Sequence, residues 1–198
     1  MPRTELTHRF DEAFAYASER FAGKVRGNTR VPSIAHAMAV SALALDMGAD
    51  ETEAIAALLH DVVEDGGGHA ALDHIRAEWG EQVAALVELS TDEIEPSGRP
   101  WREVKEDYLA RLPTEPVAAL RISLADKADN TRTLLRGLSE EGDALFARHT
   151  AGDRDTFLWY YESLVAIFRS RREELGDACA SVLTELTRVV DLLRERSG

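Results

Sequence analysis

The chain has 198 residues, enough for one domain with a substantial core and short for two. Hydrophobic residues make up 44% of it and charged residues 30%, a balance typical of globular rather than disordered proteins. The formal net charge of −13 argues against a general DNA- or RNA-binding protein, because an acidic surface repels a phosphate backbone. No apolar run reaches the roughly 18 residues that cross a bilayer, and the amino terminus lacks a signal-peptide pattern.

A single cysteine, Cys179, excludes an internal disulfide and fits a reducing compartment, so we expect a cytoplasmic protein. A small anionic ligand is compatible with the negative charge if local Lys and Arg side chains or a bound cation offset it. We therefore expect a small nucleotide as partner and neither nucleic acid nor a membrane. The oligomeric state is left open between a monomer and a homodimer.

Helical periodicity dominates the chain, whereas the strict alternation typical of strands is rare. Asp50 or Thr52 is the expected N-cap of the third helix. We predict helices, in chain order, over 8–23, 34–47, 50–65, 70–79, 81–91, 101–112, 116–136, 140–148, 153–173 and 177–196. These helices predict an all-α fold. We expect a single domain over 1–198, with a core at about 10–173 and the helix 177–196 packed on it.

The third predicted helix changes abruptly from apolar to ionisable residues in the sequence LLHDVVEDGGG. On a helix His60 and Glu64 share one face, and Asp61 and Asp65 share the next. Four ionisable groups beside an apolar core are costly to desolvate without a counter-charge, and a bound cation supplies one. The alternative is a solvated helix end that carries a chance His-Asp pair.

Two further residues stand out in apolar helices. His36 lies in the sequence IAHAMAV, where a lone histidine is more often a core residue bonded to a backbone carbonyl. Asp126 lies in LADKADNTRT, and Asn130 and Thr133 follow it at a spacing that forms one polar stripe on a helix. A solvated helix face is the alternative for this stripe. The order along the chain is therefore His, His-Asp and Asp on three separate predicted helices.

These residues and their order resemble the HD phosphohydrolase superfamily, in which four such side chains hold one divalent cation. The resemblance implies a helical bundle of about eight to ten helices around one metal site. It implies His36, His60, Asp61 and Asp126 as the ligands. Two imidazoles and two carboxylates form a borderline donor set, so we expect Mn²⁺, with Fe²⁺, Co²⁺ or Zn²⁺ as alternatives.

Within that superfamily, the sequences AALLHDVVED and LADK are similar to the two signatures of RelA/SpoT-type alarmone hydrolase domains. The similarity covers residues 10–170 and is greatest to the stand-alone small alarmone hydrolases. It implies Glu64 and Asp65 as the catalytic pair that orients or deprotonates the attacking water, whose pKa the metal lowers. The implied reaction removes the 3′-pyrophosphate of guanosine tetra- or pentaphosphate, which gives GDP or GTP and pyrophosphate.

The expected nucleotide contacts depart in part from that family. The family's adjacent Arg-Lys pair is split in the sequence KVRGNTRVPS, so Arg26 is the expected cation, with Lys24 and Arg30 as alternatives. Arg102 and Lys105 lie three apart and can meet phosphates, with a solvated face as the alternative. The expected substrate contacts are Arg26, Lys24, Arg102, Lys105, Lys127, Asn130, Thr133 and Tyr160.

Two other functions fit parts of this pattern. The first is an HD phosphohydrolase that acts on another phosphorylated nucleotide, such as a nucleoside monophosphate, and releases orthophosphate instead of pyrophosphate. The second is a non-catalytic protein that binds a metal or a nucleotide. Such a protein is expected to have lost a metal ligand or the pair Glu64 and Asp65, and this chain retains all of these residues.

Overall fold

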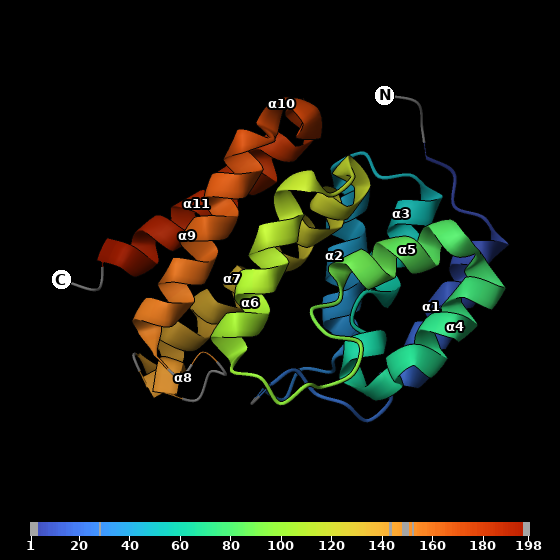
Figure 1. Cartoon of the computed structure of the whole chain (residues 1–198), viewed down its shortest axis with the longest axis horizontal. Helices are drawn as coiled ribbons and strands as arrows, with labels where there is room; N and C mark the ends of the chain where they lie inside the picture. Colours follow the sequence, from blue (N-terminus) through green and yellow to red (C-terminus); the bar gives the residue numbers. More distant parts are fainter. Residues whose placement is uncertain (1–3, 28, 143, 148–150, 152, 196–198) are drawn as a thin grey trace. The chain divides into compact units, whose positions relative to one another are not determined.

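A computed structural model describes residues 4–27, 29–142, 144–147, 151 and 153–195 of the chain (Figure 1). Within these ranges the regular elements are helices, accompanied by one isolated β-bridge between Val25 and Pro32. The predicted all-α fold is therefore confirmed. Among the described residues no helix is both long enough and apolar enough to span a membrane.

The chain divides into two compact units. The first comprises Met1–Ser97 and Pro116–Asp126, and the second comprises Gly98–Glu115 and Lys127–Gly198. The long helix α7 (Val117–Glu141) contributes to both, because the division falls inside it. The expectation of a single domain over the whole chain stays a prediction.

Helix α3 (Glu51–Leu59) lies at the centre of the first unit and packs against three of its other helices, α1, α2 and α5. All residues from Ala54 to Leu59 are buried, which explains why this helix is apolar on every side. Its start is fixed by Asp50, which caps it in a reciprocal capping box with Glu53, as predicted for Asp50. The other helices of this unit are α1 (His8–Arg20), α2 (Ile34–Asp46), α4 (Gly68–Trp79), α5 (Glu81–Ser90) and the first part of α7.

The prediction that the third helix continues to Asp65 is wrong. The α-helix ends at Leu59, residues 60–62 form a turn, and Val63–Gly67 form a π-helix. Asp65 (φ −73°, ψ 27°) and Gly66 (φ 95°) have non-helical dihedral angles, and glycine adopts the positive φ without a Cβ clash. The ionisable residues therefore lie on an irregular turn, a kind of distortion that is frequent at functional sites.

The second unit is organised around α9 (Arg154–Ser170), which packs against α6, α8, α10 and α11. Figure 1 shows α9 and α11 (Ala180–Glu195) side by side, so the predicted C-terminal helix packs on its own unit. The predicted helix 153–173 is wrong at its end, because α9 stops before Arg171. The predicted helix 140–148 is instead the end of α7 and the short α8, and residues 143 and 148 lie outside the described residues. The remaining elements are α6 (Trp101–Arg111), α8 (Ala144–Ala147), α10 (Arg172–Leu175) and the 3₁₀ turns Leu112–Thr114 and Asp177–Cys179.

Candidate functional site

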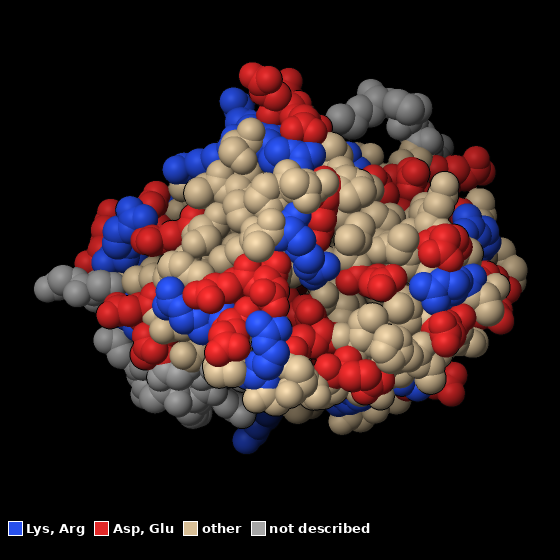
Figure 2. All heavy atoms as spheres, viewed as in Figure 1, with Lys and Arg blue, Asp and Glu red and all other residues tan. Residues whose placement is uncertain are grey.

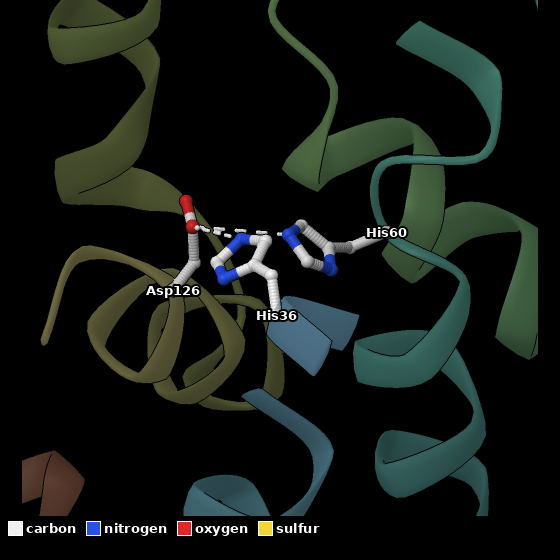
Figure 3. Close-up of side chains that lie close together, drawn as sticks. All are labelled: His36, His60 and Asp126. Atoms are coloured by element: carbon white, nitrogen blue, oxygen red, sulfur yellow. Dashed lines mark ion pairs between the residues drawn. The ribbon is translucent and has the colours of Figure 1, made fainter. Parts of the chain in front are cut away.

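Three buried side chains from three segments of the first unit converge on one point (Figure 3). His36 lies on α2, His60 directly follows α3, and Asp126 lies on α7; their exposed fractions are 6%, 2% and 8%. One candidate ligand atom from each residue lies within 4.8 Å of the other two. Oδ1 of Asp126 is 3.1 Å from Nε2 of His36 and 3.7 Å from Nε2 of His60. This is a compact donor set for a divalent cation.

Asp61 lies beside this group. Its Oδ1 is 3.1 Å from Nε2 of His60, and its Oδ2 is 3.4 Å from Nε2 of His36. The side chain is half-buried, in contrast to the two histidines. Its carboxylate therefore reaches both imidazoles from the turn that follows α3, and its role as a fourth ligand stays a prediction.

The ring of His60 is oriented by its own helix. Nδ1 lies 2.8 Å from the carbonyl oxygen of Ala57, so in the neutral ring Nδ1 carries the proton and donates it. Nε2 then faces the carboxylates with a free lone pair. This nitrogen is buried and makes no hydrogen bond of acceptable geometry among the described residues, although the oxygens of two carboxylates lie close to it. An imidazole nitrogen presented in this way fits a metal ligand.

The proximity of these groups changes their pKa values. Burial by itself raises the pKa of Asp61, but the nearby charges of His60 and His36 outweigh burial and lower this pKa to about 2. Burial lowers the pKa of His60, and Asp61 and Asp126 outweigh it and raise this pKa well above its usual value. The imidazole therefore binds a proton more tightly than a free histidine does. A metal ion must displace that proton, so metal affinity should fall as the pH falls.

The acidic pair lies on the π-helix next to this group. Oε2 of Glu64 accepts a hydrogen bond from the backbone N–H of Asp92 at 3.3 Å, so the segment after α5 holds its carboxylate. Partial desolvation and the charge of Asp61 raise the pKa of the Asp65 carboxyl, and the charge of Lys24 opposes this rise. A carboxyl with a raised pKa exchanges protons with water more readily near neutral pH.

Two of the cations expected in the loop 24–33, Arg26 and Lys24, make different contacts. Arg26 is half-buried, and its backbone N–H donates to the carbonyl of Val31 at 2.9 Å. Lys24 donates from Nζ to the backbone carbonyl of Asp65 at 2.7 Å. The sequence gives no sign of this contact or of the contact of Asp92 with the acidic pair. Both involve backbone atoms, so no pattern of side chains signals them.

In the second unit, three of the expected substrate contacts come together. Nζ of Lys105 lies 5.3 Å from the ring centroid of Tyr160, and Nζ of Lys127 lies 5.8 Å from it. Lys105 also lies 5.6 Å from the ring of Trp101, and Lys127 lies 5.3 Å from that of Tyr108. These are cation–π distances, and Tyr160 and Lys127 are buried. The two ammonium groups are thus concentrated around one aromatic side chain.

The other expected contacts in this unit have different neighbours. The guanidinium of Arg102 lies 4.0 Å from the ring centroid of Trp159, and its Nε donates to Glu106 at 3.0 Å. The hydroxyl of Thr133 accepts a hydrogen bond from Arg136 at 3.2 Å, and Asn130 is half-buried on α7. Their assignment to the substrate stays a prediction. Figure 2 shows many acidic side chains among the basic ones on the visible face, in keeping with the net charge of −13.

Residues 13–152 match the protein family described as HD domain. A probable guanosine-3′,5′-bis(diphosphate) 3′-pyrophosphohydrolase of Synechocystis sp. is 34% identical over 141 residues, 70% of this chain and 18% of that protein. The bifunctional (p)ppGpp synthase/hydrolase SpoT of Escherichia coli is 31% identical over 129 residues, 64% of this chain and 18% of that protein. The chain thus spans less than a fifth of the length of these two curated relatives.

A solved structure is similar over nearly the whole length of both chains. It belongs to a protein described as a metazoan ortholog of SpoT that hydrolyzes ppGpp. The similarity covers 98% of this chain and 98% of that one, with a TM-score of 0.72 and 26% sequence identity.

Proposed function

This chain belongs to the HD domain family, and we propose that it is a metal-dependent phosphohydrolase acting on guanosine tetra- and pentaphosphate. It removes the 3′-pyrophosphate and gives GDP or GTP and pyrophosphate. The observation that carries this proposal is the buried convergence of His36, His60 and Asp126 beside the acidic pair Glu64 and Asp65. The substrate is supported by relatives named for this hydrolysis and by the similarity to the metazoan ortholog of SpoT.

The family and the buried His/His/Asp group indicate that the chain binds a divalent metal. We propose Mn²⁺ as this metal, with Fe²⁺, Co²⁺ or Zn²⁺ as alternatives, because imidazoles and carboxylates form a borderline donor set. His36, His60 and Asp126 would hold it, with Asp61 as the fourth ligand. When bound, the metal lowers the pKa of the attacking water and offsets negative charge at the phosphoryl group.

The acidic pair supplies the proton transfer in this proposal. Glu64 is oriented by the backbone N–H of Asp92, and Asp65 has a carboxyl with a raised pKa. We assign to these two carboxyl groups the orientation of the attacking water and the removal of its proton. Their position next to the metal ligands Asp61 and His60 supports this assignment, because Asp65 interacts electrostatically with both.

The cations of the second unit are the proposed phosphate contacts. At a net charge of −13, binding a highly charged anion requires local positive charge. Lys105 and Lys127 supply it around Tyr160, whose ring also offers a surface for stacking. Arg102, Asn130 and Thr133 complete the proposed set in this unit, and Arg26 is the proposed contact from the first unit. A cytoplasmic location and a small nucleotide as partner belong to the same proposal.

The product of the reaction tests the substrate directly. Protein loaded with Mn²⁺ is incubated with guanosine tetraphosphate, and the products are identified by ion-exchange chromatography, with chelator-treated protein as the control. We expect GDP and pyrophosphate in equal amounts from the loaded protein alone. Loaded protein that leaves this nucleotide intact, yet releases orthophosphate from a nucleoside monophosphate, would overturn the proposed substrate.

A further inference from the structure

The backbone carbonyl of Asp65, within the π-helix, accepts a hydrogen bond from a side chain outside this helix. In a continuous α-helix this carbonyl accepts a hydrogen bond from the N–H four residues later. Here that N–H belongs to His69 and donates to Oε1 of Glu95 at 3.3 Å. The next N–H toward the amino terminus, that of Gly68, donates to the carbonyl of Val63 in the π pattern. The ammonium group of Lys24 donates to the Asp65 carbonyl instead, at 2.7 Å.

Lys24 is itself held at several points. Its backbone N–H donates to the carbonyl of Phe21, and its own carbonyl accepts from the N–H of Ser33, both at 3.0 Å. Its Nζ lies 5.9 Å from the ring centroid of Phe21, which is buried. Ser33 directly precedes α2, the helix that carries His36. A side chain that is constrained at its backbone and at its tip links the start of α2 to the acidic turn.

We propose that Lys24 is a positioning residue, which fixes Glu64 and Asp65 by holding the backbone carbonyl of Asp65. A hydrogen bond from an ammonium group is stronger than one between neutral groups, so its loss should loosen this turn measurably. Gly66 makes an outside restraint useful, because it has no side chain to pack and its backbone has more freedom than that of any other residue. The expected change in kcat rests on the proposed function, whereas the expected loosening of the turn does not.

A role in positioning and a role in substrate binding predict different results. A cation that binds the substrate equally well in the ground state and the transition state changes KM. A residue that places the acidic pair changes kcat, because it acts on the chemical step. The contact with the Asp65 carbonyl directs the ammonium group of Lys24 to the acidic turn, which favours positioning.

The test uses Lys24→Met, which keeps the length of the side chain and removes its charge and its donors. Lys24→Arg restores a charged donor, and Arg188→Met removes an exposed cation of α11 as a control for net charge. Backbone amide hydrogen exchange at Asp65, Gly68 and His69 is measured together with metal content and steady-state kinetics. In Lys24→Met we expect exchange at least about fivefold faster, kcat lower by about tenfold and KM within about twofold.

Metal content should equal that of the wild type in all variants, and Lys24→Arg and Arg188→Met should keep the wild-type exchange and kcat. Unchanged exchange in Lys24→Met would overturn the proposal whatever the activity. A higher KM at constant kcat would also overturn it, because it assigns Lys24 to the substrate. If the wild type does not hydrolyse guanosine tetraphosphate, the proposed function fails, and the exchange data and the rescue by arginine still decide the role of Lys24.

Discussion

The two compact units contain ion pairs of different kinds. In the first, the carboxylates of Asp61 and Asp126 both face the ring of His60, whose buried Nε2 makes no well-formed hydrogen bond within the described part of the chain. In the second, Arg132 donates two hydrogen bonds to the carboxylate of Glu185, at 2.6 and 2.7 Å. In the arginine pair, two guanidinium donors meet the two oxygens of one carboxylate. In the histidine group, two carboxylates of like charge lie beside one imidazole nitrogen. A mismatch of this kind distinguishes a binding site from a structural ion pair.

The largest expected effect comes from removing a member of the histidine group. His60→Ala and Asp61→Ala should each lose metal and activity together, because each removes a proposed ligand. The loss of metal affinity should exceed the roughly 10–100-fold that follows the loss of a residue behind the ligands. Elemental analysis of each variant, after loading with metal and dialysis, measures the metal that it retains. Glu185→Gln, in the arginine pair of the second unit, is the control that keeps its metal, and full activity in His60→Ala would place the metal elsewhere.

A second variant separates metal binding from chemistry within the first unit. Glu64→Gln keeps the size of the side chain and an oxygen that can accept the hydrogen bond from Asp92, but it cannot take a proton from water. Turnover should therefore fall by about 10²–10⁴-fold, with metal content unchanged. Steady-state kinetics and elemental analysis of the same preparation check both parts. Loss of the metal in this variant would show that Glu64 is a ligand.

In the second unit the expected effect is on substrate affinity. Lys105→Met removes one of the two ammonium groups around Tyr160 and keeps an apolar side chain against Trp101. KM for guanosine tetraphosphate should rise by about tenfold, with little change in kcat, since a phosphate contact stabilises the ground state and the transition state alike. Arg188→Met controls for the change in net charge. A fall in kcat at constant KM would contradict a role in binding.

The smallest expected effect concerns stability in the second unit. Glu115 is buried, and neither of its carboxylate oxygens has a hydrogen-bond partner among the described residues. Nη1 of Arg111 lies 3.5 Å from its Oε1. Burial raises the pKa of Glu115, and the charge of Arg111 opposes this rise. The folded state therefore binds this proton more tightly than the unfolded state, so the contribution of Glu115 to stability falls as the pH rises through the folded-state pKa.

Glu115→Gln should accordingly raise the Tm slightly at neutral pH. The difference from the wild type should shrink as the pH falls below the ordinary glutamate pKa of about 4.3. Thermal unfolding, followed by circular dichroism at neutral pH and at a pH below that of the ordinary glutamate pKa, measures this difference in Tm. A lower Tm of the variant at neutral pH would show that the pairing with Arg111 outweighs the cost of burial.

The sequence was sufficient to predict the helical fold, and its resemblance to a known family was needed to group the metal-binding candidates. The apolar periodicity and the cap at Asp50 predicted α3, and the resemblance to HD phosphohydrolases implied one metal site for His36, His60 and Asp126, which the structure places close together. The π-helix was not predicted, because the sequence up to Asp65 is equally compatible with a regular α-helix. Only the glycines from Gly66 onward indicate that the helix ends. The division inside α7 was not predicted either, since nothing in an unbroken helical pattern marks a boundary at residue 126.

The end of α3 just before His60 also has an electrostatic consequence. The peptide dipoles of a helix sum to about half a negative elementary charge at its carboxyl end, and α3 ends at Leu59. Ala57, whose carbonyl orients the ring of His60, is one of the last four residues of this helix, where carbonyls lack helical donors. The backbone of α3 therefore contributes attraction for a cation beyond that of the side chains, and no substitution that preserves the helix removes this contribution.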